Sequence, residues 1–492
     1  MFPVEIVGTM LFCSYICKHI YYNRQKEVRK IFLTVCWALT AILTAAAQHH
    51  ETVNVDAPFM MEPIQVPQFA RRDFNIKRYG AVPDNQGKNQ KAFKAAIAAC
   101  HKAGGGRVVV PSGEWQVGPI HLKSHVNLHL EEGAVLRFSD TPQDYLPAVV
   151  TSWEGTECMN YSPLIYAYEC EDIAITGKGR LEPKMDTWRE WFKRPQPHVD
   201  AMRQLYVMGA TDVPVGNRLM AQGENNMRPH LIHLNRCHGV LLEDFQIRQS
   251  PFWTIHLFMC DGGVVRGLDV QAHGHNNDGI DLEMTRNVLV EHCIFDQGDD
   301  AVCIKAGRNR DAWRLNMPAE NIVIRYCTVK KGHSVLGIGS ELSGGVRHIF
   351  MHDIEASGSV REIVQIKTNA RRGGFVDSIF VDRLHTQNAR RVVGIYSDVM
   401  YQMRNIVPTF EKRLTPITNI FISNVTTADT EAVYEILGSD ELPVRNVSLS
   451  NISVGKVGKF LNFTENVIDL HTDNITYTTY TPQKKVEIKK QR

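Results

Sequence analysis

Gly263-Val264-Val265-Arg266 and Asn287-Val288-Leu289-Val290 are two copies of a short strand unit, about 24 residues apart. Six further copies begin at Gly239, Asn321, His348, Ser378, Asn419 and Asn446. The intervals run from about 24 to about 41 residues, with no helical pattern between the copies. Short strands and turns repeated at this spacing are typical of a parallel β-helix. A sandwich or a propeller is the alternative, but irregular intervals and single coils weigh against a propeller.

A helix precedes the repeats. Between Asn89 and Lys102 the apolar residues return at helical spacing, and they are Phe93, Ala96, Ile97 and Cys100. In a β-helix such a helix can cover the otherwise open end of the stack. The run Gly104-Gly105-Gly106 ends the helix, and no G-K-S/T follows, so a phosphate-binding loop is not indicated.

The predicted fold is therefore all-β, a right-handed parallel β-helix with an N-terminal capping helix, over residues 71–480. Residues 48–70 lack periodicity and are interpreted as an arm, and residues 481–492 as a basic tail. Residues 182–229 carry several aromatic residues and no repeat unit. This insertion is either a surface excursion or a wall beside a substrate cleft, because aromatic residues on a loop suit sugar stacking.

Composition excludes some classes of partner. Among 492 residues, 43% are hydrophobic and 22% charged, as in a soluble globular protein. The formal net charge is +2, and the first 47 residues contribute about +3 of it. The remainder is close to neutral, so neither a nucleic-acid partner nor an anionic membrane surface is indicated.

The N-terminal segment resembles a secretory signal. Basic residues between Arg24 and Lys30 precede the apolar run 31–43, and Ala45-Ala46-Ala47 offers a cleavage site before Gln48. A membrane anchor is the alternative, but the run is short for a stable span. We therefore expect a leader over residues 1–47 and a secreted or periplasmic protein. Residues 1–23 fit neither interpretation, and a start assigned too far upstream is a hypothesis for them.

Eleven cysteines are present, three of them in the leader. The other eight form no C-x-x-C pair and have no His at zinc spacing. We interpret them as buried thiols that fill interior positions, rather than as a disulfide framework. No cofactor and no metal is predicted.

Three carboxylates fall in two clusters at strand ends. Asn276-Asn277-Asp278 and Gly298-Asp299-Asp300 are about 21 residues apart, which is about one coil. Residues one coil apart lie about 4.8 Å from each other. The three aspartates should therefore share one face, with His333 and Lys367 in the same segment of the next two coils.

Crowded carboxylates raise one another's pKa, which places a general acid beside an ionised base. Hydrolysis of a glycosidic bond requires such a pair. Calcium binding is a rival use of three aspartates. An ordinary cluster of turn residues is the third alternative, and the spacing alone leaves all three open.

The motifs 276–278, 298–300, Gly332-His333-Ser334 and Gln365-Ile366-Lys367 resemble, in order and spacing, those of the polygalacturonases, glycoside hydrolase family 28. The resemblance implies a pectin-lyase-like solenoid and an inverting mechanism. It implies that Asp299 is the general acid and that Asp278 and Asp300 activate water. His333 matches a histidine that sets the protonation of the acid.

The same resemblance implies substrate-binding roles for four residues. Lys367 matches a lysine that meets a uronate carboxylate, and Asn276 matches a polar subsite residue. Tyr401 is matched to a sugar-contacting tyrosine. Gln365 stands where the motif has an arginine.

Three departures from the motifs bear on specificity. Asn277 replaces a threonine, and Ser334 replaces a glycine and should add bulk where substrate passes. Gln365 lacks the charged fork of arginine. Either a nearby arginine supplies that charge, or one subsite takes a sugar other than plain galacturonate. The candidate arginines are Arg361, Arg371 and Arg372.

The predicted function is hydrolysis of alpha-linked galacturonic acid in pectic polysaccharide, with exo action or a rhamnogalacturonan substrate left open. A calcium-dependent pectate lyase and a non-catalytic carbohydrate-binding β-helix are the alternatives. The expected partner is a pectic poly- or oligosaccharide, and a monomer is assumed by default.

Overall fold

The computed structural model describes residues 51–399, 411–458 and 462–480. The predicted leader, Tyr401 and the basic tail 481–492 lie outside these residues. No helix within the described ranges has the length and apolar character needed to cross a membrane.

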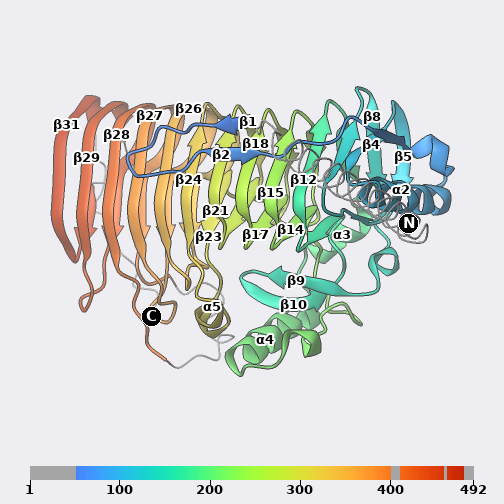
Figure 1. The fold of residues 1–492 in the computed structure, drawn as a ribbon. Helices are drawn as coiled ribbons and strands as arrows, with labels where there is room; N and C mark the ends of the chain where they lie inside the picture. Colours follow the sequence, from blue (N-terminus) through green and yellow to red (C-terminus); the bar gives the residue numbers. More distant parts are fainter. Residues whose placement is uncertain (1–50, 400–410, 459–461, 481–492) are drawn as a thin grey trace, which may run out of the picture. The chain divides into compact units, whose positions relative to one another are not determined.

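Three parallel ladders form most of the chain (Figure 1). The first ladder contains β11 (Ile165–Tyr168), β14 (Ile232–Asn235), β17 (Ile255–Phe258), β20 (Ile280–Glu283) and β23 (Val302–Lys305). The second contains β12 (Glu171–Gly177), β15 (His238–Glu243), β18 (Asp261–Arg266), β21 (Arg286–Glu291) and β24 (Ala319–Arg325). The third contains β13 (Arg180–Pro183), β16 (Gln246–Arg248), β19 (Asp269–Ala272) and β22 (Ile294–Gln297). Each strand pairs with its counterpart in the next coil, which confirms the predicted β-helix.

Later coils use longer strands. They are β25 (Thr328–Gly339), β26 (Val346–Lys367), β27 (Val376–Tyr396), β28 (Ile417–Leu437), β29 (Val444–Val457), β30 (Phe463–Glu465) and β31 (Val467–Tyr480). The repeat stacks one apolar residue per coil inside the helix. One such column contains Leu242, Val265, Val290, Ile324, Met351, Val381, Ile422 and Leu449, all buried. Each buried side chain of this size contributes roughly 1.5–3 kcal/mol.

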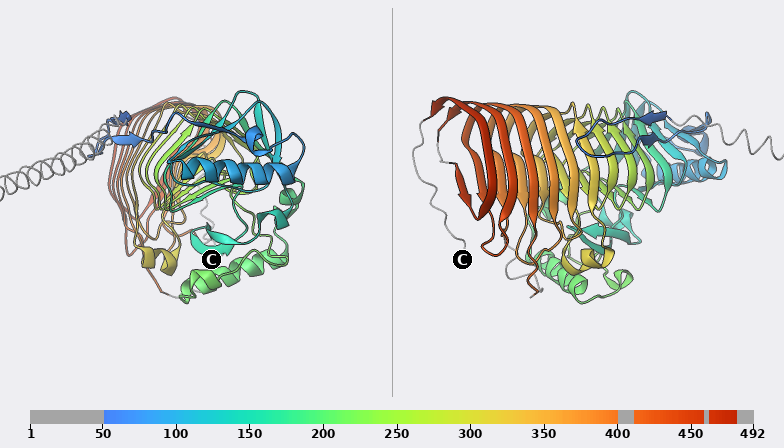
Figure 2. Two further views of the ribbon diagram at one scale, coloured as in Figure 1. Left: turned by 45° about the vertical axis from the view of Figure 1, so that its right-hand side comes forward. Right: turned by 60° about the vertical axis from the view of Figure 1, so that its left-hand side comes forward.

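Helix α2 (Gln86–Lys102) covers the N-terminal end of the stack, as predicted (Figure 2). It packs on β3 (Asp73–Asn75), β4 (Gly106–Val110), β5 (Gly113–Val117), β6 (Ile120–His121) and β7 (Val126–Leu130). The strand β8 (Ala134–Phe138) completes these first coils, with η1 (Ile76–Tyr79) and η2 (Pro142–Tyr145) beside them. Helix α2 begins three residues before the predicted start, because the Asn85 side chain accepts a hydrogen bond from the Lys88 N–H at 3.0 Å.

The N-terminal arm contains strands that its sequence pattern did not predict. It forms β1 (Glu51–Val53) and β2 (Ile64–Val66), which pair with each other. Ile64 and Val66 are buried in one cluster with Leu241 and Val264, which belong to the second ladder. A three-residue strand is too short to show a period, so only the packing identifies it.

Segments outside the coils gather beside the first ladder. They are the antiparallel hairpin β9 (Val149–Trp153) and β10 (Thr156–Asn160), then α3 (Asp186–Trp191), α4 (Gln196–Ala210), η3 (Val215–Asn217) and α5 (Asn309–Leu315). A buried ion pair, Arg218 to Asp311 at 2.9 Å, joins the insertion to α5. Glu157 of the hairpin donates its backbone N–H to the same Asp311 side chain. These contacts therefore join the insertion, the hairpin and α5 to one another.

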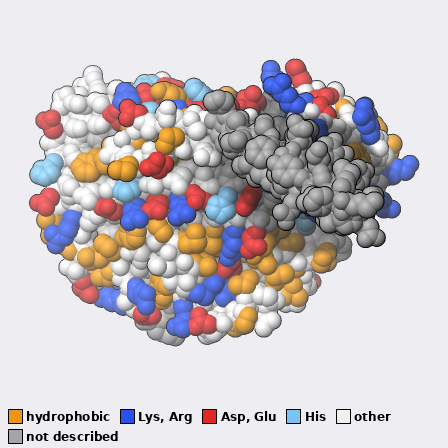
Figure 3. Space-filling model, viewed as in Figure 1, with side chains coloured by type: hydrophobic (Ala, Val, Ile, Leu, Met, Phe, Trp, Pro, Cys, Tyr) orange, Lys and Arg blue, Asp and Glu red, His pale blue; other side chains and the backbone are white. Residues whose placement is uncertain are grey.

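All eight cysteines of the described residues are buried and free, as predicted. On the face seen in Figure 3, acidic and basic side chains are interspersed rather than gathered by sign.

Candidate active site

The β-helix brings the two acidic clusters together. Asp278 lies just before β20 and Asp300 just before β23, and the Gly279 N–H donates to the Asp300 carbonyl at 3.0 Å. In the next coil the His333 N–H donates to the Asp299 carbonyl at 2.8 Å. Residues predicted to be coil neighbours are therefore joined by backbone hydrogen bonds.

A cavity of about 300 Å³ opens beside these strand ends. Its walls include seven predicted site residues, which are Asn276, Asp278, Asp299, Asp300, His333, Gln365 and Lys367. Residues from outside the coils also line it, among them Glu154 of the β9–β10 turn and Arg194 of the insertion. Of the two interpretations of the insertion, a cleft wall agrees with this position.

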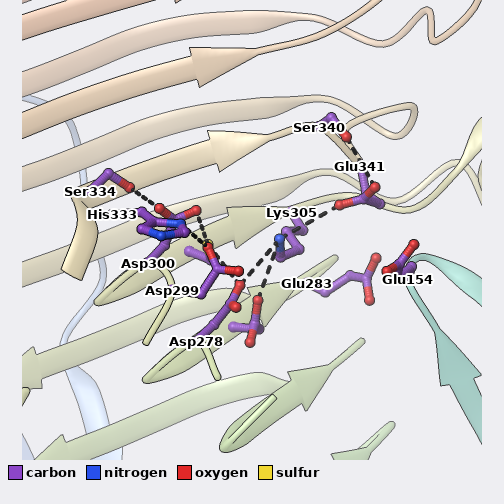
Figure 4. A network of polar contacts seen from close by, with 12 residues as sticks. Glu154, Asp278, Glu283, Asp299, Asp300, Lys305, His333, Ser334, Ser340 and Glu341 are labelled. Atoms are coloured by element: carbon purple, nitrogen blue, oxygen red, sulfur yellow. Dashed lines mark hydrogen bonds and ion pairs between the residues drawn. The ribbon is translucent and has the colours of Figure 1, made fainter. Parts of the chain in front are cut away.

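Asp299 and His333 lie side by side in the site (Figure 4). The ring Nδ1 of His333 lies 2.9 Å from Asp299 Oδ1. This hydrogen bond raises the pKa of His333, and the negative charge of Asp299 adds to the effect. The side chains are 45% and 22% exposed, so a substrate can reach them. The pair can hold a proton at the surface of the cavity.

The Asp300 side chain is buried, and both of its carboxylate oxygen atoms accept hydrogen bonds. Ser334 Oγ donates to its Oδ1 at 2.6 Å, and Lys367 Nζ donates to its Oδ2 at 3.2 Å. Burial by itself would raise the pKa of Asp300, but the Lys367 charge and the Ser334 hydrogen bond outweigh it. The pKa therefore lies well below the usual range, and Asp300 is a fixed anion.

The pKa of Asp278 shifts in the opposite direction. Burial and then the neighbouring Asp299 charge raise its pKa to about 7, although Lys305 Nζ lies 3.6 Å from its Oδ2. At mildly acidic pH the buried pair of Asp278 and Asp300 therefore holds one proton and one negative charge.

The thiol of Cys303 lies between these two carboxylates. Its Sγ is 3.3 Å from Oδ2 of both Asp278 and Asp300. A thiol has one proton, so it can donate to only one of them. No motif marks Cys303 as functional, since it resembles the other interior thiols in the sequence.

Lys305 was not predicted. It is buried, its Nζ lies 3.5 Å from Glu341 Oε2, and it sits 4.6 Å from the centre of the Trp253 ring. Its position at the end of the apolar strand Val302–Lys305 was the available signal, because a lysine in a buried strand needs a partner.

Glu341 links Lys305 to two arginines that line the cavity. Arg308 Nη2 donates to Glu341 Oε1 at 2.6 Å and lies 3.2 Å from Glu154 Oε2. Arg372 Nη2 lies 3.9 Å from Glu341. Burial would raise the pKa of Glu341, but Arg308, Lys305 and Arg372 lower it to about 2. Arg308 lies between β23 and α5, outside the strand repeats, and no motif marked it in the sequence.

The predicted substrate-binding residues differ in their contacts. The Asn276 side-chain oxygen accepts hydrogen bonds from Arg194 at 2.8 Å and Arg228 at 3.0 Å. Gln365 lies in β26 between Gly337 of β25 and Gly394 of β27. Its neighbours on both sides therefore have no side chain to cover it.

Ser334 does not narrow the substrate path, and this expectation was wrong. Its side chain is buried and lies behind Asp300, to which it donates a hydrogen bond, and it is not part of the cavity wall. A motif comparison identifies the residue at a position but not the direction in which its side chain points.

Ser334→Ala should shift the acid side of the pH profile upward. The lost hydrogen bond to a charged group is worth about 1.5–3 kcal/mol, and its loss raises the pKa of Asp300. Ionised Asp300 then disappears at a higher pH as the solution is acidified, so kcat/KM should fall at low pH and change little near neutrality. The control is Ser343→Ala, since Ser343 Oγ accepts a hydrogen bond from the backbone N–H of Asn309 and not from a charged group of the site. Superimposable profiles of wild type and Ser334→Ala would contradict the assignment.

Calcium fits these carboxylates poorly. Each already faces a cationic side chain, namely Lys305 for Asp278, Lys367 for Asp300 and His333 for Asp299. Calcium takes six to eight oxygen ligands, and an ammonium beside a carboxylate competes for the same oxygen atoms. The donor set therefore favours acid–base chemistry over a calcium site.

Comparisons with known proteins agree with this geometry. A model of the family described as "Glycosyl hydrolases family 28" matches residues 216–474, slightly more than half of the chain. A "Probable polygalacturonase" of Vitis vinifera is 29% identical over 314 residues, which are 62% of this chain and 58% of the relative. An "Exo-poly-alpha-D-galacturonosidase" of Dickeya chrysanthemi is 25% identical over 296 residues, 55% of this chain and 48% of the relative. The chain thus matches about half the length of these curated relatives.

Among solved structures, a hyperthermoactive exopolygalacturonase from Thermotoga maritima is 32% identical. The match covers 83% of this chain and 94% of that one, with a TM-score of 0.75.

Proposed function

The chain belongs to glycosyl hydrolase family 28, and on that premise we propose that it hydrolyses alpha-linked galacturonides of pectin by an inverting mechanism. The observation that carries the proposal is the division of three carboxylates into two environments. Asp299 is partly exposed beside His333, whereas Asp278 and Asp300 are buried with their pKa values moved in opposite directions.

In this mechanism Asp299 protonates the leaving glycosidic oxygen, and His333 shares and resupplies its proton. The anionic Asp300, beside Asp278, accepts a proton from the attacking water on the other side of the sugar. Water must fit between the base and the anomeric carbon, which is why inversion needs a wider carboxylate gap than retention.

The charge of the cavity supports a polyuronate substrate. Among the described residues, six basic side chains line it, which are Arg194, Lys305, Arg308, Arg361, Lys367 and Arg372. Within the same part of the chain, five acidic side chains line it, which are Glu154, Asp278, Asp299, Asp300 and Glu341. At mildly acidic pH Asp278 is protonated and His333 is charged, so the wall carries a net positive charge that suits an anionic chain.

We also propose exo action. Glu154 of the β9–β10 turn and Arg194 of the insertion line the cavity together with the catalytic aspartates. Both belong to segments outside the coils, and in this position they obstruct the path of a long polymer through the cavity. A substrate would then enter by its end. The Dickeya and Thermotoga proteins described above also carry exo-acting names.

The test is product analysis by NMR with defined oligogalacturonides. We expect saturated products whose new reducing end is first the β-anomer, and a single small product from the start of the reaction. Formation of an unsaturated, ultraviolet-absorbing product would indicate a lyase, and the α-anomer would exclude inversion. The same experiment is repeated with rhamnogalacturonan oligosaccharides. Faster hydrolysis of these would exclude homogalacturonan as the preferred substrate.

A further inference from the structure

Gln365 leaves the proposed site without the charged fork that the family motif carries at this position. An amide can donate to a carboxylate but adds no charge and no bidentate pair of N–H groups. A uronate substrate still brings one carboxylate per sugar into the cavity. Some other cation must therefore compensate.

The two lysines that line the cavity within the described ranges are already neutralised by the protein. Lys367 donates to Asp300 at 3.2 Å. Lys305 lies within 3.6 Å of Asp278, Asp281 and Glu341 and is buried. A substrate carboxylate would have to compete with these fixed anions for either lysine.

Of the four arginines that line the cavity in the part of the chain that the structure describes, three are also held in place. Arg308 is paired with Glu341 at 2.6 Å, Arg372 donates to Asn309 at 2.8 Å, and Arg194 donates to Asn276 at 2.8 Å. Arg308 and Arg372 are buried as well. Their main effect is to fix the wall on the side of Glu154 and Glu341.

Arg361 is different from all of these. Its side chain is exposed and lines the cavity. Within residues 51–399, 411–458 and 462–480, no hydrogen bond or ion pair engages its guanidinium. It is a charged fork in the cavity wall whose donors remain available to a ligand.

The strand register aligns Arg361 with the acid. Gly332 pairs with Val360 and Ser334 pairs with Glu362, so His333 of β25 lies beside Arg361 of β26. Adjacent strands are about 4.8 Å apart. Because His333 contacts Asp299 in the preceding coil, Asp299, His333 and Arg361 occupy three successive coils along one line. In the mechanism proposed above Asp299 faces the leaving group, and on that basis Arg361 lies on the leaving-group side.

We propose that Arg361 binds the carboxylate of the galacturonate on the leaving-group side of the cleaved bond, and so replaces the arginine that Gln365 lacks. The proposal rests on the proposed function above and adds the residue that selects an acidic sugar over its ester. Arg361 reaches the carboxylate from a position four residues earlier on the same strand.

The test compares wild type, Arg361→Gln and the double variant Arg361→Gln/Gln365→Arg on two substrates. One is an oligogalacturonide, and the other is the same oligomer fully methyl-esterified. Loss of a charge-assisted pair should lower kcat/KM of Arg361→Gln on the acid form by about 10- to 100-fold. The ester should lose much less, so the acid-to-ester ratio should collapse, and the double variant should recover part of it. Arg371→Gln is the control, because Arg371 does not line the cavity.

Binding of digalacturonate to the same variants, followed by calorimetry, separates the two proposals. If Arg361→Gln keeps both its affinity and its acid-to-ester ratio, the role of Arg361 is refuted while hydrolysis stands. If wild type binds digalacturonate but does not hydrolyse oligogalacturonides, and Arg361→Gln binds it more than tenfold more weakly, the inference stands and the proposed function fails. If Arg361→Gln lowers kcat/KM equally on the acid and on the ester, the effect is structural and the proposed role of Arg361 is refuted.

Discussion

Asp299→Asn should lower kcat on oligogalacturonides by about 10²–10⁴-fold, the usual contribution of a general acid. The amide keeps the shape of the carboxyl group and can still contact His333, but it cannot release a proton to the leaving oxygen. The KM value should change little, since the substrate still meets the same cationic wall. Steady-state kinetics with a trimer of galacturonate measures both parameters.

A leaving group that needs no proton isolates this role. On an aryl galacturonide with an acidic phenol, Asp299→Asn should lose far less activity than on the oligomer. The chain also offers a matched control in Asp296, which lies 2.8 Å from His273 and is 22% exposed, as Asp299 is. Asp296→Asn removes a similar carboxylate–imidazole pair outside the cavity wall and should keep full activity. Equal losses of Asp299→Asn on both substrates would refute the acid assignment.

The site residues that can be predicted from the sequence are those that the regular spacing of the coils brings together. Asp278, Asp299, His333 and Lys367 lie in successive coils, and the parallel ladder turns that spacing into proximity. Their meeting follows from backbone geometry, which a repeat in the sequence reveals. The capping helix was identified from a different period, the helical spacing of the apolar residues between Asn89 and Lys102.

The unpredicted part depends on side-chain direction and on segments outside the repeat. Glu154, Arg194 and Arg308 reach the cavity from a hairpin, the insertion and a lengthened coil, and none of these carries a repeat that could fix its position. Ser334 was placed in the substrate path because its motif lies in the cleft. Its strand instead turns the hydroxyl behind Asp300. The motifs therefore predict the type of reaction better than they predict which sugar the site accepts.

Gly337→Ala should lower kcat about 100-fold, because a displacement of about 1 Å at a reacting group can cost that much. A Cβ at Gly337 would lie 2.8 Å from Asp300 Oδ2 and 2.9 Å from Ser334 Oγ. The backbone cannot retreat, since β25 pairs with β23 on one side and β26 on the other. The Asp300 side chain must move instead, and it loses its fixed position between Ser334 and Lys367.

The loss of kcat should result from displacement of the Asp300 carboxylate and not from a less stable fold. Gly263→Ala is the matched control in another strand of the helix, where the added Cβ would meet Val288 and Val240 at ordinary contact distances of 3.5 and 3.7 Å. Both variants should keep nearly the wild-type thermal midpoint, while only Gly337→Ala loses activity. Digalacturonate should still bind to Gly337→Ala, because Arg361 and the other cavity arginines are unchanged. Full activity in Gly337→Ala would mean that Asp300 tolerates displacement, and it would then be a support for Asp278 rather than the base that accepts the proton of water.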